Sequence, residues 1–318
     1  MMNCQECNAM MKKFGKNRNG SQRYRCNECK VTCTDEVTRP VDKRRVPMEK
    51  MILALRMLLE GNSVRSVERL LGVGRDAIIA NMVEAGENCK RFLEKTIHGI
   101  NVEDVQGDEI WAFVGCKEKT RIRKGYSEEF GDAFCFTALE RNTKLMVAWH
   151  LGKRSPEDTL EFAKKLRRAT NGHFQLTVDG YKPYRKQVPL VFGNQLHFAQ
   201  LVKVFGKPEG EERQYSPPQV VDCYSVVITG KPDEDRICTS HVERANKTMR
   251  MQIRRLTRLT DGHSKKWENH EAALALFFCY YNFVRVHGSI GCTPAVKSGL
   301  ATETWSLQEL LAKAEAIG

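Results

Sequence analysis

The sequence predicts an α/β fold behind a small cysteine-rich N-terminal module, and three observations support this prediction. Two Cys-x-x-Cys pairs lie within the first 38 of the 318 residues. A helical stretch punctuated by glycine follows, and strand-like and helix-like segments then alternate from residue 99 onward. These changes of pattern divide the chain into a module at 1–38, a basic linker with a helical domain at 39–98, an α/β domain at 99–290 with an insert at about 206–237, and a tail at 291–318.

The α/β region opens with strand patterns at residues 102–115, 134–139 and 144–151. A helix is predicted from Pro156 to about Thr170, because Ser155 can cap it and proline suits its first turn. Further strands are expected at 174–178, near 195–204 and at 225–229, and helices at about 240–259 and 264–286. Three antiparallel strands, a helix and another strand are the order of a ribonuclease-H-like core, although other α/β folds share that order.

The composition indicates a polyanionic partner. Lysine and arginine total 51 against 39 aspartate and glutamate residues, which gives a formal net charge of +12. This balance favours nucleic acid over an acidic membrane surface as the partner. No apolar run approaches the roughly 18 residues of a membrane span and no signal peptide opens the chain, so we expect a cytoplasmic protein without a membrane partner. Twelve cysteines in such a chain indicate thiols and metal ligands rather than disulfides.

Four cysteines predict a structural zinc ion in the N-terminal module. Cys4 and Cys7 form one pair, Cys26 and Cys29 form the other, and 18 residues separate them. Two thiolates from each pair can close a tetrahedral Zn²⁺ site, and a module this small needs the metal to fold. Four thiolates leave no open position for catalysis. Cys33 could compete as a ligand but reads better as a spare thiol.

Residues 61–82 have the pattern of a helix-turn-helix. Ser63 can cap a short helix, a Gly-Val-Gly turn follows it, and a second helix begins at Arg75. The second helix of this motif enters the DNA major groove, so Arg75, Asp76 and Asn81 are candidate contacts to bases or phosphates. Many helical hairpins bind nothing. The position after a cysteine module and a basic linker favours DNA binding here.

Two aspartates occur in or at the end of apolar strand-like stretches, where an ionised carboxylate is costly unless it is paired or bound to metal. These are Asp108 in VQGDEIWAFVG and Asp179 in FQLTVDGYKPY. Glu109 competes with Asp108, because alternation along the strand does not settle which of the two points inward. Asp179 followed by Gly180 can also be read as a simple turn.

The segment HVERANKTMRMQIRR contains a single acid, Glu243, among cations. At helical spacing Glu243 shares one face with Lys247, Arg250 and Arg254. An acid on a face that suits a phosphate backbone is either a salt-bridge partner for Lys247 or a metal ligand. With Asp108 it can join a set of carboxylates that holds two Mg²⁺ or Mn²⁺ ions, while Lys247 and Arg254 are candidate DNA contacts.

Several motifs in order over most of the chain resemble one known family. They are GSQRYRCNECK, LLGVG, GDEIWAFVG, TVDGYKPY, HVERANKTMR and YYNFVRVHGSIGCTP. The chain resembles bacterial insertion-sequence transposases of the IS-one family, within the DDE superfamily. The resemblance implies a zinc ribbon, a helix-turn-helix and a ribonuclease-H-like core whose triad is Asp108, Asp179 and Glu243. It also implies that Arg250 contacts the scissile or flanking phosphate.

The resemblance further implies a function and partners. We expect an enzyme that binds the terminal inverted repeats of its element in double-stranded DNA, cleaves a strand and transfers it to target DNA. It would act in the bacterial cytoplasm as at least a dimer. Glu243 follows Asp179 by 64 positions, more than in compact members, and Glu268 and Glu271 are fallback ligands. The alternatives are a catalytically silent DNA-binding regulator derived from a transposase, and a nuclease or resolvase of the same fold.

Overall fold

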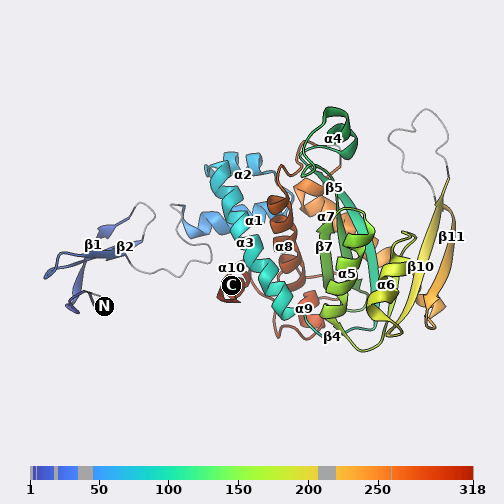
Figure 1. Cartoon of the computed structure of the whole chain (residues 1–318). Coiled ribbons are helices and arrows are strands. Elements are labelled where there is room, and N and C mark those ends of the chain that lie inside the picture. Colours follow the sequence, from blue (N-terminus) through green and yellow to red (C-terminus); the bar gives the residue numbers. More distant parts are fainter. Residues whose placement is uncertain are drawn as a thin grey trace.

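The computed structural model of the chain describes residues 3–4, 6–17, 21–34, 46–206, 220–258 and 260–317. It is a mixed α/β structure in which a six-stranded sheet carries helices on both faces (Figure 1). Within the described residues no helix is both long and apolar enough to cross a membrane.

The N-terminal module is a small antiparallel sheet. Its strands, in the order β1-β2-β3, are β1 (Met11–Lys16), β2 (Gln22–Cys26) and β3 (Thr32–Thr34). Its buried apolar cluster consists of Cys4, Met11 and Cys26. A cluster of this size cannot offset the conformational entropy of the module, so the stability must come from another source.

Three helices follow where the sequence predicts a helical domain. They are α1 (Met48–Leu59), α2 (Val64–Leu71) and α3 (Arg75–Thr96). Ser63 caps α2 through the N–H of Ser66, and Gly72 ends it with φ of 63°, a left-handed conformation that favours glycine. Both end signals were predicted correctly. α3 begins at Arg75 as predicted and continues for 22 residues, beyond the 61–82 motif.

The main sheet contains the strands that the sequence predicts. In spatial order they are β11 (Val220–Thr229), β10 (Leu196–Phe205), β9 (Phe174–Asp179), β5 (Asp104–Val114), β6 (Gly131–Glu140) and β7 (Met146–Gly152). β5, β6 and β7 are antiparallel, whereas β9 runs parallel to both β5 and β10. β11 is antiparallel to β10, so this part of the predicted insert extends the sheet. Residues 207–219 of the insert lie outside the described residues.

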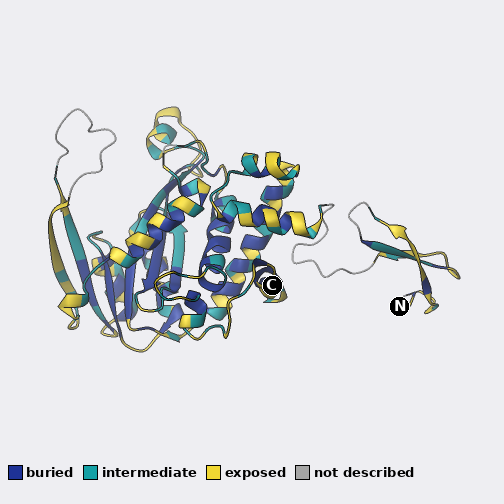
Figure 2. Ribbon diagram, turned by 180° about the vertical axis from the view of Figure 1, so that it is seen from behind, coloured by how far each residue is buried: buried dark blue, intermediate teal, exposed yellow. Residues whose placement is uncertain are grey.

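Helices cover the two faces of the sheet. α5 (Pro156–Ala169) and α6 (Tyr184–Phe192) lie on one face, where Phe136 of β6 packs against Phe162 and Tyr184. α7 (Ser240–Gln252) and α8 (Trp267–Phe283) lie on the other, where Trp149 of β7 packs against Phe278. α3 packs on α8, and one hydrophobic core runs through the sheet and these helices (Figure 2). The predicted domain boundary at residue 98 therefore does not coincide with a break in the core.

Shorter elements complete the fold. They are β4 (Ile100–Asn101), α4 (Glu118–Lys124), β8 (Thr170–Asn171), the 3-10 turns η1 (Glu234–Arg236) and η2 (Arg254–Leu256), α9 (Pro294–Lys297) and α10 (Leu307–Ile317). The region expected as a tail contains α10, which buries Leu307, Leu310 and Leu311 in the main core. It is therefore an integral part of the fold.

One predicted helix, at about 240–259, is wrong in extent. α7 ends at Gln252, because Ile253 adopts an extended conformation with ψ of 101° and is buried. Arg250 then donates to the carbonyl of Leu256 at 2.8 Å, which holds the chain in the short turn η2. Arg254 consequently does not lie on the helix that carries Glu243, and the four-residue face predicted from helical spacing is interrupted.

Candidate functional site

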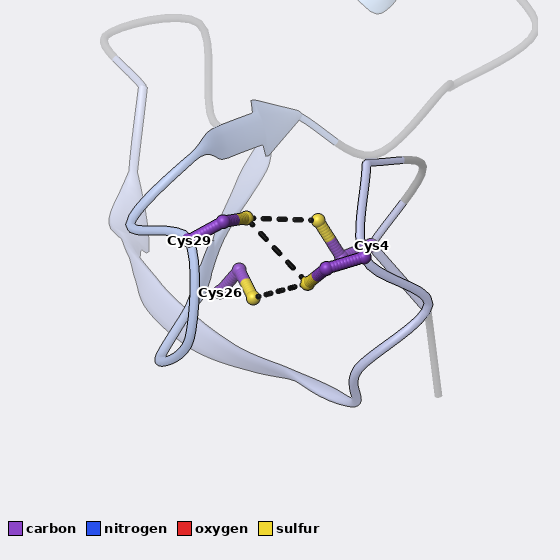
Figure 3. Close-up of side chains that lie close together, drawn as sticks. Cys4, Cys26 and Cys29 are labelled. Atoms are coloured by element: carbon purple, nitrogen blue, oxygen red, sulfur yellow. Dashed lines mark hydrogen bonds between the residues drawn. The ribbon is translucent and has the colours of Figure 1, made fainter.

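The first candidate site is a cluster of four sulfur atoms in the N-terminal module (Figure 3). Cys4 and Cys29 lie 3.4 Å apart, Cys7 and Cys26 3.4 Å, and Cys7 and Cys29 3.6 Å, measured between Sγ atoms. In a tetrahedron with Zn–S bonds of about 2.3 Å the sulfurs are about 3.8 Å apart, so the cluster could hold a structural metal such as zinc.

The surroundings of these sulfurs support metal binding. Backbone N–H groups, first that of Cys29, lower the pKa of the Cys26 thiol to about 7, and backbone N–H groups also lower that of Cys4. Hydrogen bonds among the sulfurs raise the pKa values of Cys7 and Cys29, so in the absence of metal the four thiols do not all ionise together. Cys33 does not belong to the cluster, because its thiol points to the sulfur of Met11 at 3.3 Å. The spare-thiol interpretation of Cys33 agrees with this contact.

The second candidate site begins with Asp108 and Asp179, which are neighbours on the two central strands of the main sheet. β5 and β9 run parallel, and Gly107 and Val178 are the last pair in their register. Asp108 and Asp179 directly follow this pair, on strands about 5 Å apart. The charge of Asp179 helps to raise the pKa of Asp108, as expected for two carboxyl groups at close range.

Alternation along β5 separates Asp108 from Glu109. Asp108 is level with Thr137 of β6, whose hydroxyl contacts a side chain of α7. Glu109 is level with Phe136, which packs against Tyr184 of α6. Because paired residues share a face, Asp108 faces α7 and Glu109 faces α5 and α6 on the opposite side. The register of β5 and β6 therefore places these two adjacent acids on opposite faces of the sheet.

Asn246 of α7 orients the Asp108 carboxylate. Its Nδ2 donates to Asp108 Oδ2 at 2.8 Å, and its Oδ1 lies 3.3 Å from the hydroxyl of Thr137, which fixes the direction of the amide. Asn246 is buried. Asn246 thereby fixes one oxygen of the Asp108 carboxylate and sets the orientation of the group. The sequence analysis missed Asn246, although it lies about one helical turn after Glu243 and faces the same strand.

Glu243 lies in the first turn of α7 and is held by two side chains. Lys203 of β10 forms an ion pair with Glu243 Oε1, and the hydroxyl of Thr239 donates to the same oxygen at 2.5 Å. Lys203 is two residues beyond Leu201, which is level with Asp179, so Lys203 and Asp179 share a face of the sheet. The ion pair of Glu243 is therefore with Lys203 rather than with Lys247 on its own helix.

Gln106 ties the start of α7 to β5. Its side chain is fully buried, and its Oε1 accepts the backbone N–H groups of two consecutive α7 residues at 3.0 and 3.2 Å. Thr239, the N-cap residue, supplies no capping hydrogen bond, so Gln106 satisfies amides that the helix leaves free. With Asn246, this fixes α7 on β5 at two points. Packing therefore sets where Glu243 lies relative to Asp108.

Burial and mutual repulsion raise the pKa values of the carboxyl groups in this site. Burial, and then the charge of Asp179, raises the pKa of Asp108 to about 7 and that of Glu109 to about 8. Burial also raises the pKa of Asp179, against the N–H of Tyr181 and the charge of Arg154. Carboxyl groups arranged in this way gain from any added positive charge.

Arg154, which follows β7, is a second residue that the sequence analysis missed. Its Nη2 lies 3.0 Å from Glu109 Oε2 and 3.5 Å from Asp179 Oδ2, and its guanidinium stacks over the ring of Tyr181 at 4.2 Å. The Glu109 side chain is 3% exposed, whereas that of Arg154 is 41% exposed. Arg154 thus neutralises a buried acid from the solvent side. No sequence motif marked it.

The three predicted acids do not yet form a compact ligand set. Among the residues that the structure describes, only the four cysteines place three or more potential ligand atoms within 4.8 Å of one another. Neighbouring donors engage one oxygen of Asp108 and one of Glu243, and both oxygens of Asp179 are engaged, by the N–H of Tyr181 and by Arg154. Their donor atoms are all carboxylate oxygens, the type that Mg²⁺ and Mn²⁺ prefer.

The fallback acids on α8 are engaged elsewhere. Glu271 forms an ion pair with Lys90 of α3 at 2.7 Å, and Glu268 forms one with Lys266 at 3.4 Å. Neither is among the groups that shift the pKa of Asp108. This geometry favours Glu243 over both as the partner of the two aspartates.

The predicted cationic contacts have different environments. Lys247 and Arg254 are exposed, as a DNA contact requires. Arg250 is half-buried and donates to the carbonyls of Leu256 at 2.8 Å and Trp111 at 3.3 Å, so its guanidinium holds the fold together instead of lying free at the surface. Burial lowers its pKa to about 10. The expected phosphate contact by Arg250 would require it to leave these carbonyls.

Arg255 is not a surface charge. Burial lowers the pKa of its guanidinium to about 10. It donates to Asn269 O at 2.9 Å and to Ser264 Oγ at 3.2 Å, and its Nη2 lies 3.1 Å from Met82 Sδ. Arg255 therefore joins η2, α8 and α3, whereas its neighbour Arg254 faces solvent. Of these two neighbouring arginines, Arg254 is the exposed one and remains the candidate DNA contact.

Of the three candidate DNA contacts on α3, two are exposed and one is buried. Arg75 is 55% exposed and pairs with Glu68 of α2 at 3.3 Å, and Asp76 is exposed. Asn81 is fully buried, with its Nδ2 3.5 Å from the carbonyl of Met51, so it cannot reach DNA from this position and its prediction as a DNA contact is wrong. Helical spacing alone could not show which face of α3 meets α1.

An open groove of about 660 Å³ runs along α3 near its start. Its charged lining residues are mostly acidic: Asp76, Glu84, Glu87 and Glu268, with Lys266. Phosphate groups would be repelled from this side of the helix.

Comparison with known proteins identifies no family. No protein-family model matches the chain, and no curated protein matches it. Among solved structures the chain is similar to a cryo-EM structure of a piggyBac transposase synaptic complex with hairpin DNA. That match covers 87% of this chain and 62% of the other, with 10% sequence identity and a TM-score of 0.31. A similarity at this level supports no argument about fold or function, so function must be inferred from the geometry of the chain itself.

Proposed function

We propose that the protein is a DNA transposase of the IS-one type, a DDE polynucleotidyl transferase that cleaves and joins strands of double-stranded DNA. One observation carries this proposal. Asp108 and Asp179 lie side by side on central parallel strands, and Glu243 is held near them because Asn246 and Gln106 fix its helix to the same strand. Two carboxylates at strand positions and a third on a helix suit metal-dependent phosphoryl transfer.

The topology of the main sheet supports a ribonuclease-H-like core. Three antiparallel strands, β5, β6 and β7, are followed by α5 and by β9, which returns parallel to β5. This is the order that the sequence predicts for such a core. The helical region from α1 to α3 would be the helix-turn-helix part, with the cysteine module as a zinc ribbon, and both would bind the terminal inverted repeats.

The acids of the site fit divalent metal. Asp108, Asp179 and Glu243 would hold Mg²⁺ or Mn²⁺, and the raised pKa of Asp108 reflects a site that gains from added positive charge. Bound metal would polarise the phosphate and lower the pKa of an attacking water or 3′-hydroxyl. No covalent bond between protein and DNA is needed.

The other residues of the site would prepare it for this reaction. Asn246 holds Asp108 Oδ2 and so sets the orientation of the carboxylate. Gln106 holds the first turn of α7, which sets the reach of Glu243. Lys203 and Arg154 are cations beside the acids, and a phosphate backbone that enters the site can take over their charge. DNA entry would then free Glu243 and Asp179.

The test compares single substitutions on DNA that carries the native sequence flanking the gene. Asp108→Asn, Asp179→Asn and Glu243→Gln should each abolish Mg²⁺-dependent cleavage and strand transfer, while end binding is kept. Glu271→Gln, on α8, is the matched control and should remain active. Strand transfer retained by all three variants would refute the proposal. Cleavage by the wild type without a joined product would indicate a nuclease or resolvase, and the absence of both would indicate a DNA-binding regulator.

A further inference from the structure

α4, in the connection between β5 and β6, has no buried residue. Ile122 is 67% exposed and Tyr126, just beyond the helix, is 44% exposed. In Figure 1 the helix stands at the top of the view, beyond the ends of β5 and β6. An exposed isoleucine on a helix that contributes nothing to the core gains nothing from folding alone.

The base of this connection is nevertheless firmly held. The N–H of Gly115 donates to the carbonyl of Ser264 at 2.8 Å, and the indole N–H of Trp267 donates to the carbonyl of Glu129. Lys153 Nζ donates to the carbonyl of Asp132 at 3.0 Å. A helix without buried residues, on a base that is tied to the 264–267 segment and to Lys153, is presented to solvent in a defined position.

The charge of the tip suits DNA. Its exposed cations are Lys117, Lys119, Arg123 and Lys124. Glu118, the acid of α4, is paired with Arg121, whereas the exposed acids Glu128 and Glu129 beyond the helix offset only two of these four charges. Proteins that bind duplex DNA use cations to contact the phosphates and apolar side chains to press into a groove, and the tip offers both.

The tip lies at a useful distance from the candidate active site. β5 continues for six residues from Asp108 to Val114 before α4 begins. Six residues of strand span about 20 Å, which corresponds to about six base pairs of duplex at about 3.4 Å per pair. A duplex with its scissile phosphate at Asp108 could therefore reach α4 without bending.

We propose that α4 is a DNA-docking surface, on which Lys119, Arg123 and Lys124 bind phosphates of the duplex beside the reacting bond and Ile122 presses into a groove. This inference rests on the proposed function, because it takes the duplex to be held at Asp108. It adds to that function a contact surface that no sequence motif marks. The charge favours double-stranded DNA over a protein partner, because the exposed cations Lys119, Arg123 and Lys124 lie within three residues of the exposed Ile122 on the same short helix.

The test measures binding of the full chain to a labelled mixed-sequence duplex as a function of salt concentration. The variant Lys119→Gln/Arg123→Gln/Lys124→Gln should bind more weakly, and the slope of log K against log salt should become less steep by up to about 2.7, at about 0.9 for each phosphate that the protein no longer neutralises. The control Lys164→Gln/Lys297→Gln/Lys313→Gln removes the same charge from exposed positions on other helices and should leave the slope almost unchanged.

A second variant separates the apolar contact from the charge. Ile122→Ala should weaken binding by a few-fold at every salt concentration without changing the slope, and thermal unfolding should show that the fold is intact. Equal effects of the two triple variants, or an unchanged slope in the α4 triple, would overturn the α4 surface while leaving the proposed function standing. A wild-type protein that binds no duplex would overturn both.

Discussion

Replacing Asp108 with asparagine should stabilise the folded protein in magnesium-free buffer, and the gain should grow with pH. Burial, and then the charge of Asp179, raises the pKa of Asp108 from 3.8 to about 7. Between these two values the folded chain keeps a proton that the unfolded chain has released. The folded state binds more protons there, so the stability contributed by this group falls as pH rises from about 4 to about 7.

The size of the gain follows from the shift. A difference of about 3 units at about 1.4 kcal/mol per unit gives at most about 4 kcal/mol above pH 7. At pH 5, which lies only about one pH unit above the pKa of the carboxyl group in the unfolded chain, the gain is about 1.5 kcal/mol. An asparagine at this position can still accept the N–H of Asn246, so the substitution removes the charge and keeps the hydrogen bond.

Thermal unfolding at pH 5 and pH 8, followed by tryptophan fluorescence, measures the effect. At about 2 °C per kcal/mol for a chain of this size, the melting temperature should rise by up to about 8 °C at pH 8 and by about 3 °C at pH 5. Glu303→Gln removes an acid at an exposed position and is the matched control, with no change expected. An equal rise at both pH values, or a fall at pH 8, would refute the assignment of a costly buried charge to Asp108.

Three further predictions follow from the site and its surroundings. Arg255→Ala should lower the free energy of unfolding by about 2–4 kcal/mol because it leaves buried acceptors without a donor, whereas Arg254→Gln should weaken only DNA binding; urea unfolding and a binding titration separate them. Cys26→Ser should reduce the zinc content measured by elemental analysis to near zero, and an unchanged content would contradict the metal site. Asn246→Ala should weaken Mn²⁺ binding measured by calorimetry about tenfold or more, because Asp108 loses a charge-assisted hydrogen bond of about 1.5–3 kcal/mol; unchanged binding would contradict the positioning role.

Local signals in the sequence predicted much of the fold. Ser63 and Ser155 were expected to cap helices, and each accepts the N–H of the residue three positions later. The alternating segments became β5, β6, β7 and β9 within a few residues of the predicted limits. These features depend on neighbours in the chain, so a sequence contains the information that sets them.

Features set by tertiary contacts could not be predicted in the same way. α7 stops at Gln252 because buried Ile253 turns into the core, and no capping residue announces that stop. α6 was missed because Pro189 lies inside it, a residue that ordinarily argues against a helix. Asn81 looks like a surface residue by type and is buried, and Arg255 is half-buried with its guanidinium bonded to Ser264 and Asn269. Only the packing of α3 and α8 against their neighbours decides this.

Within the candidate site, the ion-pair partner of Glu243 is likewise set by tertiary contacts and not by neighbours in the chain. The sequence offers Lys247, four residues later on the helix, where an ion pair is worth a few tenths of a kcal/mol. The parallel register of β9 and β10 instead brings Lys203 to the face that carries Asp179, and Lys203 takes the carboxylate. Lys247 is left exposed on the outer side of α7. Cations beside the acids, Lys203 and Arg154, and a further cation that faces outward, Lys247, suit a site that must both hold its carboxylates in place and receive a phosphate backbone. The distinction between Lys203 and Lys247 depends on strand order, which helical spacing does not contain.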